Sequence, residues 1–176
     1  MGPIAHSGVG LLGWQITSSP KRKNIKTLLL FLFVSNLPDF DFFLLLIPAT
    51  HGKHIHQTYT HNLMFVLIVA FLFSLFLPTT REKLGLVFAG LSHLLLDLFV
   101  VDPVQPVGFR LFYPFSRKLY NFGLFPYLER GDLKKMLSTH NIIALACEAI
   151  VFLLPVVFFY RKELAASFRK KEFWEI

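Results

Sequence analysis

Histidine and aspartate occur in this chain within stretches that are otherwise apolar. His93 and Asp97 lie inside the apolar run 84–101. Residues four apart on a helix share one face, one turn apart, so these two side chains can reach the same metal ion. A charge at bilayer depth costs about 2.5–3.5 kcal/mol even on the most lenient scale, so such residues usually pair, bind an ion or line a pathway. The pair therefore indicates a metal site, and a buried ion pair is the alternative interpretation.

A second pair of acids, Asp39 and Asp41, interrupts the apolar run 28–47. Residues two apart face nearly opposite sides of a straight helix, but Pro38 removes a backbone donor and can break the helix there. An interrupted membrane helix whose irregular backbone lines a polar cavity is a recognised place for a binding site. We therefore expect ligands here. The alternative is that Asp39 caps a second half-helix while Asp41 reaches water.

Further ligand-type side chains lie in the stretch 51–61, which holds four histidines. Such a stretch is typical of metal binding but not specific to it, and His61 could simply cap or solvate a helix. His6 gains weight as a ligand only together with the others, because a lone histidine is more often a packed polar residue. Glu148 is another acid in an apolar run, where burying its charge in the bilayer costs free energy. It is predicted to ligate, to act as a base or to pair with a histidine.

The composition favours a membrane protein over a soluble domain. Of 176 residues, 54% are hydrophobic and 16% are charged, a low charged share for a soluble domain of this length. Cys147 is the only cysteine, which excludes an internal disulfide. The net charge of +7 does not indicate nucleic-acid binding, because the basic residues fall in short clusters beside apolar segments, as juxtamembrane anchors do.

Five helical segments can be drawn, and they predict an all-α fold that forms one domain over residues 1–176. The segments are expected at residues 4–17, 26–47, 63–77, 84–101 and 142–160. About 20 residues are needed to cross the hydrocarbon layer, so the second, fourth and fifth are adequate and the third is marginal. The first is short and rich in glycines that permit close helix packing. The prediction is a multi-pass membrane bundle of about four to five helices.

Basic residues predict the orientation of this bundle. If all five segments cross, eleven lysines and arginines fall on one side and seven on the other. By the positive-inside rule the N-terminus lies outside and the C-terminus inside a plasma membrane or bacterial inner membrane. Four separate segments then deliver their histidines and acids to the outer half of the bilayer. This shared depth is the strongest sequence argument for a single site.

The long connection 102–141 mixes aromatic and basic side chains. Eight phenylalanines and tyrosines between residues 109 and 127 accompany Arg110, Arg117 and Lys118. Aromatic and basic residues together suit the headgroup layer, so the connection is predicted to be an interfacial loop in contact with membrane lipids. The alternative is an amphipathic loop that packs on its own protein.

Taken in order, these residues resemble the YdjM-like family, membrane-bound proteins predicted to be metal-dependent hydrolases and distantly similar to zinc-dependent phospholipase C. The family pattern has an N-terminal histidine on a Gly-rich helix, then P-D-x-D, H-R-G-x-T-H-S, H-x-x-x-D and a segment ending in Y-P-F-S. Here the parts are His6 and residues 38–41, 56–62, 93–97 and 108–116. The resemblance covers about residues 1–117, some two thirds of the chain.

The resemblance implies a helical membrane protein with a zinc site and a phosphoester-type hydrolytic activity. The implied metal ligands are His6, Asp39, Asp41, His56, His61, His93 and Asp97. The chain departs from the pattern at Gln57, where arginine is usual, and at Asn62, where serine is usual. Because an arginine there could hold a phosphate, Gln57 bears on both substrate class and catalytic competence.

The chemistry of the donors points to the same function. Mixed histidine and aspartate ligands suit zinc or a similar divalent ion, and more than four candidates exceed one tetrahedral site, so one or two ions are expected. Two ions about 3.5–4 Å apart, bridged by a carboxylate, would serve a phosphoryl displacement. The leading hypothesis is a hydrolase of a phosphoester in a lipid or lipid-like substrate that arrives from the outer leaflet, with Asp41 and Glu148 as catalytic candidates.

Two rival hypotheses remain. A transporter or metal-handling protein would use intramembrane acids and histidines as an ion path. Their clustering in one half of the bilayer argues against a path, which needs polar groups across the full depth. A catalytically inactive family member that binds a partner protein is the other rival, and Gln57 favours it.

Overall fold

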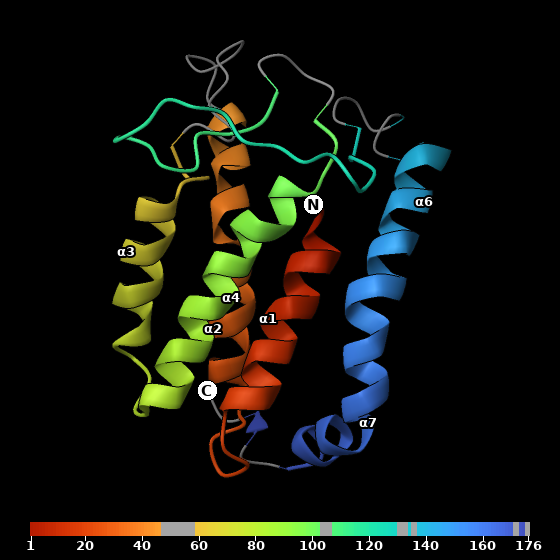
Figure 1. Cartoon of the computed structure of the whole chain (residues 1–176). Helices are drawn as coiled ribbons and strands as arrows, with labels where there is room; N and C mark the ends of the chain where they lie inside the picture. Colours follow the sequence, from red (N-terminus) through yellow and green to blue (C-terminus); the bar gives the residue numbers. More distant parts are fainter. Residues whose placement is uncertain (47–58, 103–106, 130–133, 135–136, 171–172, 175–176) are drawn as a thin grey trace.

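The helices of this chain stand side by side, with α1 at the centre (Figure 1). The structure is a computed structural model that describes residues 1–46, 59–102, 107–129, 134, 137–170 and 173–174, with only the backbone for residues 42–46. The α-helices are α1 (Pro3–Thr17), α2 (Ile25–Asn36), α3 (Leu63–Ser74), α4 (Thr80–Leu98), α6 (Thr139–Glu148) and α7 (Leu154–Phe168). The described residues form no β-strand, and their extended parts meet only in isolated bridges.

Packing around α1 organises the bundle. α1 contacts α2 and α4 on one side, and α3 lies outside α4. On the other side of α1, α6 and α7 are joined through a π-helical segment, η3 (Ala149–Leu153), into one rod of 30 residues. The all-α prediction with five helical segments is therefore confirmed for the described part of the chain.

Observed helix starts differ from the predicted ones where a polar residue caps the helix. α4 begins at Thr80, ahead of the predicted residue 84, because the Thr79 hydroxyl accepts a hydrogen bond from the Glu82 N–H. α6 begins at Thr139, ahead of the predicted residue 142, because Ser138 caps it in the same way. Hydropathy places these starts too late, since the caps and first turns are polar.

The predicted helix 26–47 is interrupted near Pro38. α2 ends at Asn36, and a 3₁₀ helix, η1 (Leu37–Leu46), continues from it. Proline has no N–H to donate to the α-helical ladder, and a run of 3₁₀ winding in place of an α-helix often marks a functional segment. The break expected from Pro38 is therefore confirmed, and the 3₁₀ helix that follows it carries Asp39 and Asp41.

Glycines on α1 allow its neighbours to approach closely. A Cβ atom at Gly8 would lie 2.8 Å from the carbonyl oxygen of Phe152 in η3, and one at Gly10 would lie 3.1 Å from the carbonyl oxygen of Phe31 in α2. Side chains at these positions would therefore push α1 away from both neighbours. The close packing predicted for these glycines is confirmed.

The two ends of the bundle differ in chemistry. At one end, the α1–α2 connection, the start of α4 and the tail after α7 come together (Figure 1). There Arg22 Nη1 lies 3.6 Å from Glu82 Oε2, and Lys170 Nζ lies 3.5 Å from the Pro20 carbonyl oxygen. The basic stretches 21–26, 81–83 and 161–170, here called the three basic clusters, thus share one end. The N-terminus, the end of α4 and the starts of α3 and α6 share the other.

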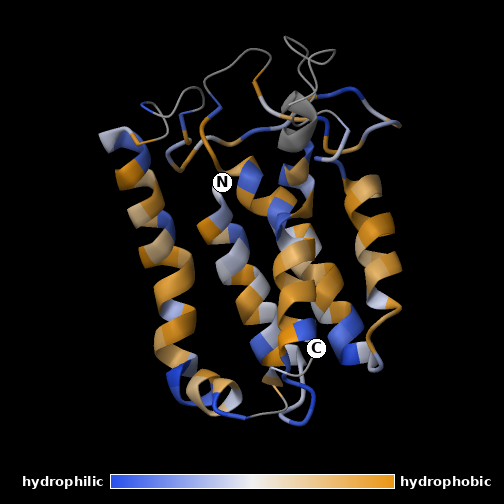
Figure 2. Cartoon of the chain, turned by 180° about the vertical axis from the view of Figure 1, so that it is seen from behind, coloured by the Kyte–Doolittle hydropathy of each residue, from blue (hydrophilic) through white to orange (hydrophobic). Residues whose placement is uncertain are grey.

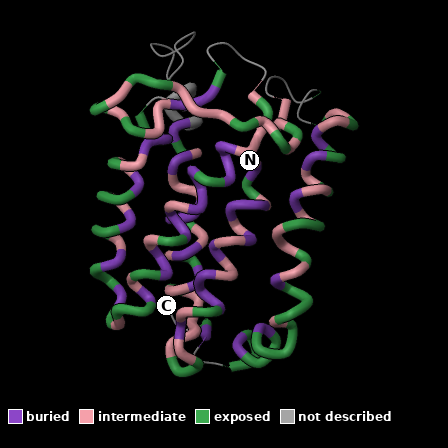
Figure 3. Tube along the Cα trace, in the orientation of Figure 1, coloured by how far each residue is buried: buried purple, intermediate pink, exposed green. Residues whose placement is uncertain are grey.

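Apolar side chains cover the outside of the bundle as well as its core (Figures 2 and 3). Phe71 on α3 is 60% exposed and Phe158 on α7 is 61% exposed. Among the described helices, the rod Thr139–Phe168 is the one long and apolar enough to cross a membrane, and α3 is a shorter apolar helix. At 1.5 Å per residue its 30 residues amount to about 45 Å of helix, more than the roughly 30 Å of bilayer hydrocarbon, and the last turns of α7 bend away from the long axis of the rod (Figure 1).

Residues 107–129, here called the covering loop, cross the end of the bundle opposite the basic clusters (Figure 1). The backbone N–H of Phe122 donates to the carbonyl oxygen of Leu98 at 2.6 Å, and the Phe109 side chain is buried against α3 and α4. Phe115, in contrast, is 86% exposed. The loop therefore packs on its own protein, as the alternative interpretation stated, and contact of its exposed face with lipid stays a prediction.

Candidate metal centre

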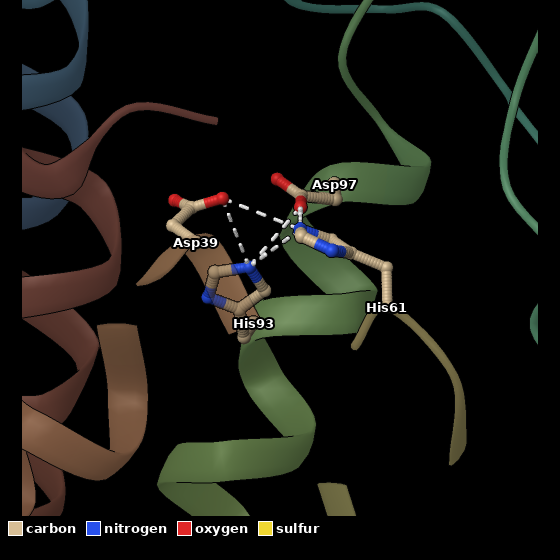
Figure 4. Close-up of side chains that lie close together, drawn as sticks. All are labelled: Asp39, His61, His93 and Asp97. Atoms are coloured by element: carbon tan, nitrogen blue, oxygen red, sulfur yellow. Dashed lines mark hydrogen bonds and ion pairs between the residues drawn. The ribbon is translucent and has the colours of Figure 1, made fainter. Parts of the chain in front are cut away.

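Four side chains from three elements converge beneath the covering loop (Figure 4). Asp39 comes from η1, His61 from the turn before α3, and His93 and Asp97 from the last turns of α4. Each offers one ligand atom, and these atoms all lie within 4.8 Å of one another. His61 and His93 are fully buried and Asp97 is nearly so. We call these four residues the metal cluster.

Five of the six separations within the metal cluster are close to those of a tetrahedral ligand set. His61 Nε2 lies 3.3 Å from Asp39 Oδ1 and 3.3 Å from Asp97 Oδ2. The same nitrogen lies 3.3 Å from His93 Nε2. His93 Nε2 lies 3.7 Å from Asp39 Oδ1 and 3.2 Å from Asp97 Oδ2. Tetrahedral zinc with ligands at about 2.0–2.1 Å needs ligand atoms about 3.3 Å apart, so the residues fit such an ion.

His93 is held in the tautomer that a metal ligand needs. Its Nδ1 lies 2.8 Å from the backbone carbonyl oxygen of Ser35 in α2. A carbonyl oxygen can only accept, so Nδ1 carries the proton and donates it. The lone pair of the neutral ring is then on Nε2, which faces the cluster. Metal-ligating histidines almost always donate their other N–H in this way.

His61 is held in the same tautomer by a relay of two side chains. The Thr60 hydroxyl donates to Asp41 Oδ2 at 2.7 Å, so its oxygen is left to accept from His61 Nδ1 at 3.1 Å. Asp41 Oδ2 itself lies 3.6 Å from that nitrogen. Asp39 and Asp41 therefore lie on opposite sides of one imidazole, with Asp39 at Nε2 and Asp41 at Nδ1.

Of the other predicted ligands, Asp41 and His6 lie beside the metal cluster. Asp41 lies behind His61 and outside the four-atom group. His6 stacks on His93, with ring centroids 3.8 Å apart, and its Nε2 lies 3.3 Å from Asp97 Oδ1. The Met1 amino group also contacts Asp97 Oδ1. His56, like His51, His54 and Gln57, falls outside the described residues.

Glu148 was expected to ligate a metal, act as a base or pair with a histidine, and the structure places its carboxylate at the start of α1. It accepts hydrogen bonds from the backbone N–H groups of Gly2 and Ala5. These belong to the first turn of a helix, where N–H groups lack an intrahelical acceptor. The structure does not bring Glu148 into the metal cluster.

Asn62, which stands where the family pattern has serine, caps α3. Its side chain accepts a hydrogen bond from the Phe65 N–H at 2.8 Å. Asparagine and serine are equally good in this role. The departure at Asn62 therefore leaves the local structure that presents His61 intact.

Sequence reasoning did not assign roles to Thr60, Ser35 and Phe109. Thr60 belongs to the same motif as His61, so its position was a usable signal. Ser35 acts through its backbone carbonyl, which any residue type would supply. Phe109 comes from the covering loop, and its ring centroid lies 6.1 Å from that of His61; only the tertiary structure shows that it closes this side of the site.

Comparison with known proteins agrees with the motif order. A family model described as YdjM inner membrane protein matches residues 1–170. The chain belongs to this family. The match confirms the resemblance and extends it beyond residue 117, so that it also includes Glu148. The YdjM description states an inner membrane protein and names no reaction, and the distant similarity to phospholipase C stays a prediction.

One curated relative is the uncharacterized protein YvsG of Bacillus subtilis (strain 168). It is 29% identical over 92 residues, which are 52% of this chain and 52% of YvsG. The chain thus spans about half the length of the curated relative that it matches. No solved structure matches the chain.

Proposed function

We propose that this member of the YdjM family is a multi-pass membrane hydrolase. It would use a divalent metal, with zinc as the ion that fits best, to cleave a phosphoester in a lipid or lipid-like molecule. The observation that carries the proposal is the metal cluster. The two imidazoles carry their protons on Nδ1, and their Nε2 lone pairs lie with two carboxylate oxygens in one group whose atoms are all within 4.8 Å of one another. Mixed nitrogen and oxygen donors suit zinc.

The cluster residues would bind the ion, neighbouring residues orient the two histidines, and one side of the cluster is accessible from outside. A divalent ion bound there would lower the pKa of a water molecule toward about 7 and polarise a phosphoryl oxygen. Ser35 and Thr60 fix the two imidazoles, so that they need no rearrangement when a ligand arrives. The Asp39 side chain is 21% exposed, whereas that of Asp97 is 4% exposed. Substrate therefore reaches the cluster on the Asp39 side.

The exposed apolar surface supports insertion of the whole bundle in the bilayer. Soluble monomers rarely expose contiguous apolar patches larger than a few hundred Å², yet the outer faces of α3, α4, α6 and α7 are apolar (Figure 2). By the positive-inside rule the basic end of the bundle is cytoplasmic. The metal cluster then lies in the outer half, beneath the covering loop.

The covering loop suits a substrate with a phosphate. Arg117 and Lys118 are exposed on it, Arg110 is half-buried, and its one acid, Glu129, is its last residue. Arginine and lysine form charge-assisted hydrogen bonds with phosphate, and an exposed Phe115 suits the headgroup layer. We therefore propose that a lipid phosphoester of the outer leaflet is held between this loop and the metal cluster.

The transporter hypothesis is less consistent with the interior of the bundle. Apart from Asp41 and Glu148, which lie at the same end as the metal cluster, the other buried acid outside the cluster among the described residues is Glu82, at the basic end, where it pairs with Arg22. Between the two ends the interior is packed with apolar side chains that include Phe31 and Leu86. An ion path needs polar groups across the full depth, and this layer interrupts one.

The test is metal analysis of the purified protein followed by a phospholipid hydrolysis screen in mixed micelles. We expect zinc to copurify, and we expect chelator or His93→Ala to reduce hydrolysis more than 100-fold. His140→Ala is the matched control, because His140 lies at the start of α6 and bonds the Tyr127 carbonyl instead of the cluster. Metal-free protein whose thermal stability is unchanged by chelator would contradict the proposal.

A further inference from the structure

We propose that this centre holds two divalent ions, bridged by Asp39 and Asp97, and that His6 is a ligand of the second ion alone. The inference deepens the proposed function and rests on the first ion at the metal cluster. It assigns a role to His6, which touches the cluster without belonging to its four-atom group.

The oxygens of both aspartates are divided between two sets of histidines. Asp97 Oδ2 lies 3.2 Å from His93 Nε2, whereas Asp97 Oδ1 lies 3.3 Å from His6 Nε2. Asp39 repeats the pattern, with Oδ1 3.3 Å from His61 Nε2 and Oδ2 3.8 Å from His6 Nε2. One ion at the metal cluster uses only Oδ1 of Asp39 and Oδ2 of Asp97. The remaining oxygens and His6 Nε2 form a second set of donors.

The stacked rings of His6 and His93 set the distance between the two positions. Their planes are inclined by only 15° and their centroids lie 3.8 Å apart. Both Nε2 atoms face the same Asp97 carboxylate, one at each oxygen. An ion bound to an imidazole nitrogen lies close to the ring plane, so two parallel rings hold two ions at about the spacing of the rings. Two-metal sites that act on phosphoesters have ions about 3.5–4 Å apart.

The second position already attracts positive charge. The Met1 amino group contacts Asp97 Oδ1, and the Met1 carbonyl oxygen lies 3.3 Å from His6 Nε2. His6 is fully buried. The Met1 carbonyl oxygen can only accept, so without an ion the proton of His6 lies on Nε2, and Nδ1 has no hydrogen-bond partner among the described groups. Binding of an ion at Nε2 therefore requires this proton to move to Nδ1. With one nitrogen and several oxygens, this position suits zinc or a harder ion such as Mn²⁺. An ion there would take the place of the ammonium contact at Asp97.

The test is the metal stoichiometry and electron paramagnetic resonance spectrum of the full chain, stripped of metal and reloaded with Mn²⁺ as the probe. We expect two ions per chain and a spectrum broadened by exchange coupling through the bridging carboxylates. One ion per chain with an isolated Mn²⁺ signal at saturating metal would overturn the inference and leave the Met1 amino group as the second cation. This measurement on the unaltered protein decides the question even where a variant does not fold.

Variants of single residues test whether His6 is a ligand of the second ion. His6→Ala is expected to lose one of the two ions and all of the coupling, while the His140→Ala control keeps both. Two coupled ions in His6→Ala would overturn the role of His6. The outcomes also separate this inference from the proposed function. A single uncoupled ion with chelator-sensitive hydrolysis refutes only the second ion, whereas two coupled ions without hydrolysis support the second ion and refute the hydrolase.

Discussion

Glu148 accepts a hydrogen bond from the backbone N–H of Gly2, a residue 146 positions earlier in the chain. Its other oxygen accepts from the Ala5 N–H at 3.3 Å, so one side chain of α6 caps the first turn of α1. A carboxylate at this place also interacts favourably with the positive end of the helix dipole. Glu148 thereby ties the helix that carries His6 to the rod formed by α6 and α7.

Replacement of Glu148 by alanine is therefore expected to lower both stability and metal binding. The two lost hydrogen bonds have a charged acceptor, and each such bond contributes about 1.5–3 kcal/mol. The midpoint of thermal unfolding should fall, and the affinity for zinc should fall with it because His6 is no longer fixed. Cys147→Ala, one residue away and only half-buried, is the control and should change neither quantity.

Glu148→Gln separates this capping role from the catalytic role predicted for Glu148. An amide keeps one acceptor oxygen, so we expect about half of the stability loss seen in Glu148→Ala, with hydrolysis reduced in proportion to metal occupancy. Loss of hydrolysis at full metal occupancy and unchanged stability would show instead that the carboxylate acts as a base.

Thr60→Val tests the relay behind His61. Valine has nearly the shape of threonine but can neither accept from His61 Nδ1 nor donate to Asp41. Removing such an outer partner of a metal-binding histidine typically costs about 10–100-fold in metal affinity, and we expect that loss in a chelator-competition titration. The exposed Thr139 supplies the matched control, Thr139→Val. Equal zinc affinity in both variants would contradict the relay.

Substitutions at Asn62 test whether the departure from the family pattern is a change of cap. Asn62→Ser should keep the bond from the Phe65 N–H, whereas Asn62→Ala should lose it and reduce the free energy of unfolding by about 1 kcal/mol. The serine variant also loses the bond that Asn62 donates to the Tyr59 carbonyl oxygen. Its free energy of unfolding should therefore lie between those of the unaltered protein and Asn62→Ala. Equal losses for serine and alanine would rule out capping as the reason for asparagine.

The sequence predicted the helices and part of the cluster for clear physical reasons. The four-residue spacing of His93 and Asp97 places both on one helix face. Pro38 marks the break after α2, and Asp39 lies in the 3₁₀ helix at this break. Contacts between distant segments had no such local signal. The capping of α1 by Glu148 depends on how closely η3 approaches Gly8, and the tautomer of His93 depends on a backbone carbonyl. The membership in the YdjM family came from the order of motifs, which needs no tertiary structure.

The side of the membrane that the centre faces decides which substrates can reach it. Lys118 belongs to the covering loop, and Lys21 belongs to the basic connection between α1 and α2; both are exposed. In a background with Cys147→Ala, a cysteine at position 118 should react with an impermeant thiol reagent in intact cells, whereas a cysteine at position 21 should react only after lysis. This pattern is what the positive-inside rule requires if the basic end is cytoplasmic. The reverse pattern would move the cluster to the cytoplasmic half of the bilayer. The ligand geometry would be untouched by that result, but a phosphoester of the outer leaflet could then no longer be the substrate.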